Sequence, residues 1–125
     1  MGMMEKVSCA SCGSEWECPT GCGFMHGNLE RVAVLYPEDV QKEIDNCTNG
    51  EKFPWFDFAY RLSYCRNCNT IESIPYLKTG SVHTAFAGKC AKCGQDVQLI
   101  ENIENLPCPV CHKKGLSKAE TGTWD

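Results

Sequence analysis

Paired cysteines are the residues of this chain best suited to chemistry. The 125-residue sequence has 11 cysteines, and the spacing Cys-x-x-Cys occurs four times. Such a pair forms a zinc knuckle, a tight turn that presents two thiolates to one tetrahedral metal ion. Gly, Asn or His follows each pair, and these residue types tolerate the positive φ at which the chain must reverse. The sequence therefore predicts eight metal ligands, in a first (Cys9, Cys12), second (Cys65, Cys68), third (Cys90, Cys93) and fourth (Cys108, Cys111) knuckle.

Two zinc ions are the expected cofactors, because closed sites of four thiolates are typical of structural zinc. A tetrahedron of four sulfurs also suits iron, so a rubredoxin-like iron protein is an alternative. Metal binding supplies on the order of 10 kcal/mol in such sites. We therefore expect folding to depend on the metal.

Two schemes can pair the knuckles into sites. Fourteen residues separate the third knuckle from the fourth, close to the roughly 15–20 typical of a zinc site. We therefore expect these two to share an ion, which by elimination joins the first knuckle to the second. The alternative joins the second knuckle to the third and leaves the first to the pair Cys18 and Cys22.

Three cysteines lie outside the four knuckles. Cys18 and Cys22 are spaced by three residues, and they could form a third site with His26 and Cys47. The competing interpretation is that they are small buried side chains, because free cysteine is among the most buried residue types. For Cys47 we favour the core, since it shares one helix face with Val40 and Ile44.

The sequence favours a protein without enzymatic activity. The segment PCPVC at 107–111 matches half of the zinc deaminase signature, but no His-x-Glu motif accompanies it. A Cys-x-x-Cys oxidoreductase needs one reactive pair near a βαβ unit, which the pattern does not predict. We therefore predict no catalytic residues, no small-molecule substrate, and a structural role in contacts with another macromolecule.

The net charge and the N-terminal segment indicate which kind of partner and which cellular compartment to expect. The formal net charge is −4, and two sites of four thiolates would bring it to roughly −8. An acidic chain favours a protein partner, although Lys89, Lys92, Lys113 and Lys114 near the last two knuckles keep a nucleic-acid partner as the alternative. The segment MGMMEKVSCA lacks the apolar region of a signal peptide, and no apolar run is long enough for a membrane helix. We expect a soluble, cytoplasmic protein.

The pattern of apolar residues predicts a small, mainly β protein of two zinc ribbons. We expect an N-terminal ribbon over 1–79, with one short helix inserted at about 37–49, and a C-terminal ribbon over 80–125. Residues 5–9 and 14–18 are predicted as one hairpin, and 56–65 and 70–77 as the arms of another. Further strands are expected at 28–36, at 81–90 with Val82, Thr84 and Phe86 on one face, and near Val97 and Leu99. We also expect Trp124 to cap a small core.

Parts of the sequence resemble bacterial protein families. The segments VSCASCGSEWE, YPEDVQKEIDNCTNGEKF and RLSYCRNCNTIESIPY are similar to the CpXC domain, a cysteine-pair protein with a helical insert between two knuckles. The proline that follows the first cysteine in that family is absent from CASC and CRNC. The second half, which ends in Gly-Thr-Trp-Asp, resembles the C-terminal ribbon of bacterial double-zinc-ribbon proteins. The resemblance implies that the first and second knuckles share an ion and that Cys22 is not a ligand, and it implies no reaction.

Overall fold

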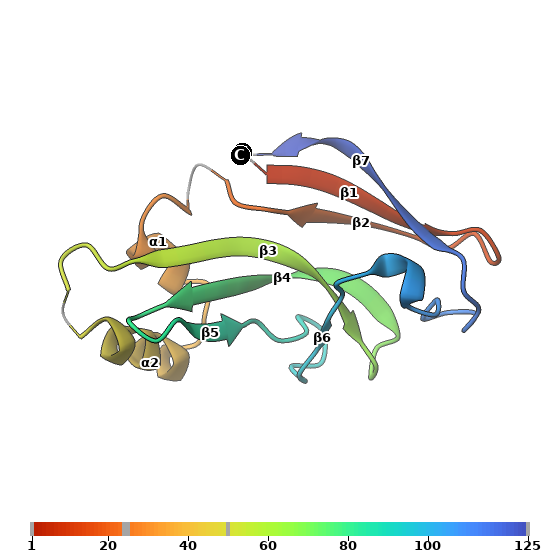
Figure 1. Cartoon of the computed structure of the whole chain (residues 1–125). Helices are drawn as coiled ribbons and strands as arrows, with labels where there is room; N and C mark the ends of the chain where they lie inside the picture. The colour runs from red at the N-terminus through yellow and green to blue at the C-terminus, as the bar shows by residue number, and fades with distance from the viewer. Residues whose placement is uncertain (1, 24–25, 50, 125) are drawn as a thin grey trace.

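The computed structural model describes residues 2–23, 26–49 and 51–124, which form two antiparallel sheets, two α-helices and a short 3-10 helix at Ile103–Asn105 (Figure 1). The three-stranded sheet has the order β2-β1-β7, and the four-stranded sheet the order β5-β4-β3-β6. The strands are β1 (Gly2–Cys9), β2 (Glu15–Thr20), β3 (Phe56–Cys65), β4 (Thr70–Thr79), β5 (Thr84–Ala87), β6 (Gln98–Leu99) and β7 (Leu116–Trp124). The expected mainly β class with two groups of four cysteines is confirmed.

Consecutive strands form both of the predicted N-terminal hairpins. β1 pairs with β2 from Met3 to Ser8, and β3 pairs with β4 along the full length of both strands. The predicted C-terminal ribbon is not formed as expected, because β6 has only two residues and joins β3. The tail forms a nine-residue strand, β7, which pairs with β1. Each sheet therefore combines strands from both sides of the predicted boundary between residues 79 and 80.

Two helices cover one end of the four-stranded sheet (Figure 1). The predicted helix is confirmed as α2 (Glu38–Thr48), where Ile44 is buried and Val40 and Cys47 pack against the same core. Asn49 ends it in the left-handed conformation at φ 46°. Gly50, which the sequence favours as the residue that ends this helix, lies outside the described residues.

Two of the predicted strands are wrong. Residues 28–36 contain helix α1 (Leu29–Ala33), because the Asn28 side chain caps its first turn by accepting the Arg31 N–H at 3.0 Å. The predicted strand 81–90 is limited to β5, since Gly80 and His83 adopt positive φ and form a turn. Val82 lies in that turn with 82% of its surface exposed, away from the face that carries Phe86.

The buried residues form two separate cores. The first core lies between the sheets and contains Val7, Cys18 and Leu116 from one sheet and Leu62 and Ile71 from the other. The second core lies between the helices and the four-stranded sheet, and its members are Val32, Tyr36, Ile44, Phe58, Leu77 and Phe86. An isolated bridge between Gly21 and Tyr60 connects the sheets directly.

Candidate metal centres

Eight cysteines, those of the four predicted knuckles, gather into two groups of four. The terminal cluster, named for its position near both chain ends, holds Cys9, Cys12, Cys108 and Cys111. The central cluster holds Cys65, Cys68, Cys90 and Cys93. In each group the four Sγ atoms all lie within 4.8 Å of one another.

Strand pairing assembles the terminal cluster. β1 ends at Cys9, and β7 begins opposite it, with Cys9 in register with Leu116. The Ala10 N–H donates to the Gly115 carbonyl at 3.2 Å, which ties the first knuckle to the fourth. Cys9 Sγ lies 3.6 Å from Cys111 Sγ, and Cys12 Sγ lies 3.7 Å from Cys108 Sγ.

The turn between β3 and β4 supplies half of the central cluster. Cys65 ends β3 and Cys68 lies in that turn, while the third knuckle follows β5 in the chain. Cys65 Sγ and Cys93 Sγ are 3.6 Å apart, and Cys68 Sγ and Cys90 Sγ are 3.8 Å apart. The Glu72 carboxylate accepts the Ala91 N–H at 3.2 Å, which attaches the third knuckle to β4.

The predicted reversal of the chain at each knuckle is confirmed. The residue after the second cysteine has positive φ in all four cases: Gly13 at 76°, Asn69 at 51°, Gly94 at 71° and His112 at 62°. In the first, third and fourth knuckles this residue donates its N–H to the carbonyl of the first cysteine, at 2.8–2.9 Å. One local geometry therefore presents both sulfurs of each pair in the same way.

The predicted pairing of the knuckles is wrong, although the eight cysteines themselves come together. The first knuckle lies beside the fourth and the second beside the third, so the favoured scheme fails for both sites. The alternative scheme is correct for the second and third knuckles and wrong in giving the first to Cys18 and Cys22. The long β1–β7 ladder determines the outcome, and linear spacing carries no information about that pairing.

The geometry of both clusters fits a tetrahedral ion. Sulfurs about 2.3 Å from a central ion lie about 3.8 Å from one another, and the close pairs here are separated by 3.6–3.8 Å. A disulfide would need about 2.05 Å between sulfurs, and all 11 cysteines are free. Both clusters could therefore hold a metal ion through four thiolates.

The thiols of each cluster differ in acidity. Hydrogen bonds from Ser14 lower the pKa of Cys12 to about 6, and the backbone of Gln95 together with Asn67 lowers that of Cys93 to about 6. The neighbouring Cys93 and desolvation raise the pKa of Cys68 to about 12. For Cys111, desolvation and the neighbouring thiols outweigh the Lys113 backbone and raise the pKa to about 11. Four adjacent thiolates repel one another, and a bound cation would remove that repulsion.

The remaining candidate ligands lie apart from the clusters. Cys18 is buried in the first core, and burial raises its pKa. Cys22 is exposed, Cys47 packs on the second core, and His26 lies against the ring of Phe58 with its Nδ1 accepting the Gly23 N–H at 2.9 Å. Among the residues that the structure describes, these side chains form no third group with metal-binding geometry.

Comparison with known proteins adds no relative. No family model, no curated protein and no solved structure matches this chain. The resemblance to the CpXC domain therefore stays a prediction. Within residues 2–23, 26–49 and 51–124, no helix is both long and apolar enough to span a membrane.

Proposed function

We propose that this chain is a structural zinc protein with one zinc ion in each cluster. The observation that carries the proposal is the pair of four-sulfur groups, whose close sulfurs lie 3.6–3.8 Å apart. Zinc bound by four cysteines has no open position for a substrate or a reactive water, so the role is structural and not catalytic. Iron is the competing ion, and it would give a coloured protein where zinc gives a colourless one.

This zinc protein acts by contacting another protein in the cytoplasm. The formal net charge of −4 becomes roughly −8 once each zinc is held by four thiolates, which disfavours the approach of a nucleic acid. Large apolar side chains are also exposed, with Phe53 87% and Val82 82% accessible. A reducing compartment keeps the thiols available for metal.

A nucleic-acid partner is the second candidate, because Lys92, Lys113 and Lys114 are exposed beside the clusters. Binding to phosphates weakens steeply as the salt concentration rises. A labelled single-stranded oligonucleotide, titrated at low and then at moderate salt, separates the candidates. We expect no salt-dependent binding, and a steep salt dependence would favour the nucleic-acid role.

Metal content tests the zinc proposal. Purified protein should contain two zinc ions per chain by elemental mass spectrometry. Cys12→Ser should retain one ion, because the terminal cluster loses a ligand. Cys22→Ser is the matched control, an exposed cysteine outside both clusters, and it should retain two. Equal metal content in both variants, or iron in place of zinc, would contradict the proposal.

A further inference from the structure

The two clusters differ in how far their sulfurs are open to solvent. Of the eight knuckle cysteines, all of which lie in the described part of the chain, Cys12 alone is exposed. Cys9 and Cys108 of the same cluster are buried, and the central cluster has two buried cysteines and two of intermediate exposure. In Figure 1 the turn that carries Cys12, between β1 and β2, lies at one end of the molecule. A dissolved reagent therefore reaches Cys12 more easily than any other ligand.

Exposure of Cys12 matters because a metal ligand is a thiolate, the nucleophilic form of cysteine. Oxidation of a cysteine follows its thiolate character and its exposure, and the first product is a sulfenic acid. The Ser14 Oγ lies 3.2 Å from Cys12 Sγ, so its hydroxyl can donate to the thiolate or to an oxygen atom beside it. Cys12 therefore has the properties of a site that a hydroperoxide oxidises.

A second thiolate is in place to react with oxidised Cys12. Cys108 Sγ lies 3.7 Å from Cys12 Sγ, and a disulfide needs about 2.05 Å. The hydrogen bond from the Ala10 N–H to the Gly115 carbonyl holds the first knuckle beside the fourth. The two sulfurs therefore need to approach by less than about 2 Å to form a bond.

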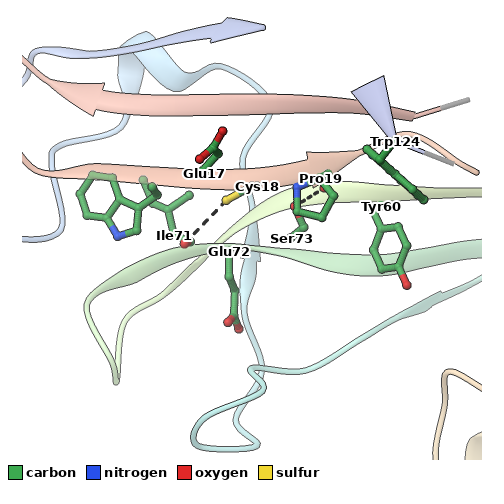
Figure 2. A pocket seen from close by; sticks show the side chains of 9 residues that line it. Glu17, Cys18, Pro19, Tyr60, Ile71, Glu72, Ser73 and Trp124 are labelled. Carbon is green, nitrogen blue, oxygen red and sulfur yellow. Dashed lines mark hydrogen bonds between the residues drawn. The ribbon is translucent and has the colours of Figure 1, made fainter. Parts of the chain in front are cut away.

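The cysteines outside the clusters lack this arrangement. Figure 2 shows Cys18 in the cleft between the two sheets, where its Sγ lies 4.0 Å from the Ile71 carbonyl oxygen and only 3% of the residue is exposed. Cys22 is exposed, but it belongs to neither group of four sulfurs. Among the described cysteines, full exposure and a group of neighbouring thiolates therefore occur together at Cys12 alone.

We propose that a hydroperoxide oxidises the terminal cluster at Cys12 and thereby releases its zinc ion, while the fold is kept. The Cys12 thiolate attacks the terminal peroxide oxygen, and the O–O bond breaks. The products are a sulfenic acid at Cys12 and an alkoxide, which takes a proton from water. The Cys108 thiolate then attacks the Cys12 sulfur and displaces hydroxide, which forms the S–S bond. Two electrons pass in total from the two thiolates to the peroxide.

Zinc leaves the oxidised cluster because only Cys9 and Cys111 remain as ligands, and structural zinc is held by four. The new disulfide joins the same two positions, 96 apart in the chain, that the metal joined. It therefore replaces the metal as the cross-link between β1 and β7. Reduction of the disulfide restores the four thiolates, so the release is reversible. The proposal rests on the zinc function proposed above.

Peroxide treatment of the zinc-loaded protein tests the proposal. Hydrogen peroxide is added in steps of about one equivalent, free zinc is followed with a chromogenic chelator, and disulfides are mapped by mass spectrometry. One zinc ion per chain should leave first, at a rate roughly tenfold above that of the second, together with a disulfide between Cys12 and Cys108. Loss of both ions at one rate, or a first disulfide without Cys12, would overturn the proposal.

Two ligand exchanges sharpen the test. Cys12→His removes the exposed thiolate but keeps a zinc ligand, because three cysteines and one histidine also hold structural zinc. It should slow the first release of zinc roughly tenfold. Cys93→His makes the same exchange in the central cluster and should leave the first release unchanged. Equal release from both variants would contradict the proposal, and if Cys12→His binds only one zinc ion, the disulfide map of the native protein decides.

The zinc content before oxidation separates this proposal from the zinc function itself. Fewer than two zinc ions at the start would contradict the zinc function, whereas two ions that leave together under peroxide would overturn the oxidation site alone. Hydrogen exchange of the oxidised protein should show the β7 amides still protected, and a dithiol with added zinc should restore the second ion. Unprotected β7 amides after oxidation would show that the disulfide does not replace the metal as a cross-link.

Discussion

The two sheets of this protein depend on different sources of stability. In β7 only Leu116 is buried, and residues 117–123 are all exposed. The four-stranded sheet packs its helices through a core of six apolar or aromatic side chains, among them Ile44 at 1% exposure and Leu77 at 0%. The terminal cluster lies at the end of the three-stranded sheet where β7 begins, next to Leu116.

This difference shows where a metal ion contributes most to a small protein. The terminal cluster joins Cys12 to Cys108 across 96 positions, whereas Cys68 and Cys90 of the central cluster are separated by 22. Closing the longer loop costs more chain entropy, by about 1 kcal/mol on the logarithmic scale. A bound zinc contributes on the order of 10 kcal/mol, which offsets that cost and secures a strand with little apolar contact.

Removal of the terminal cluster should have the largest effect. In Cys108→Ser/Cys111→Ser the site loses two of four ligands and with them a stabilisation on the order of 10 kcal/mol. We expect the amides of β1 and β7 to lose protection in hydrogen exchange, whereas the β3–β4 ladder stays protected by the second core.

Cys22→Ser/Cys47→Ser is the control, since it removes two cysteines that belong to neither cluster. This control should leave the hydrogen exchange of the β7 amides unchanged. If the β7 amides stayed protected from hydrogen exchange in the terminal-cluster variant, apolar contacts alone would hold the three-stranded sheet together. The two sheets would then not differ in their source of stability.

Local features of this fold could be predicted from the sequence. The alternation of apolar residues predicts β3, and the knuckle that follows it predicts β4 as the opposite arm of a hairpin. The acidic first turn after Pro37 predicts α2. The residue types that follow each knuckle predicted the four positive φ angles. These features depend on neighbouring residues only, so a pattern of a few residues contains the necessary information.

Long-range pairing could not be predicted in the same way. The segment 116–124 contains few apolar residues, and nothing local marks it as the partner of β1. Because the sequence does not reveal that ladder, the 14-residue spacing between the third and fourth knuckles favours the wrong pairing of knuckles. The cleft between the sheets was missed for the same reason, because Trp16, Tyr60 and Trp124 meet only after both sheets have formed.

The second largest effect should come from the apolar core. Ile44→Ala removes a side chain that is 1% exposed between α2 and the sheet, and it should cost about 2–5 kcal/mol of unfolding free energy. Urea denaturation measures this loss, and zinc content should stay at two ions. Val34→Ala, at a position that is 67% exposed, is the control and should change stability by less than about 0.5 kcal/mol. Loss of zinc from Ile44→Ala would show that the two regions are not energetically separate.

A smaller effect is expected at the knuckles, where the two clusters can be compared directly. Gly13 and Gly94 hold φ of 76° and 71°, and an added Cβ would meet no atom within 4 Å at either. Gly13→Ala and Gly94→Ala should therefore each cost about 1–2 kcal/mol through backbone strain alone. Gly122→Ala, equally open but without positive φ, is the control and should cost less. Thermal unfolding measures all three, and a cost at Gly122 as large as at the knuckles would contradict the strain argument.

The smallest effect should be a pH dependence at His26, which lies where the two regions meet. Its ring is 4.7 Å from Phe58 of one sheet and 5.8 Å from Trp124 of the other, and burial lowers its pKa below the usual 6.5. Its Nδ1 accepts the Gly23 N–H, which a protonated Nδ1 could not do. The unfolded chain therefore binds a proton more readily than the folded one. The stability contributed by neutral His26 is complete above pH 6.5 and is lost as the pH falls through the lowered pKa.

Acid also releases metal from thiolates, and for that reason the measurement is the difference in melting temperature between the native protein and His26→Gln. That difference should shrink as the pH falls from about 7.5 to 5.5, and parallel pH profiles would show that His26 does not sense the contact between the sheets.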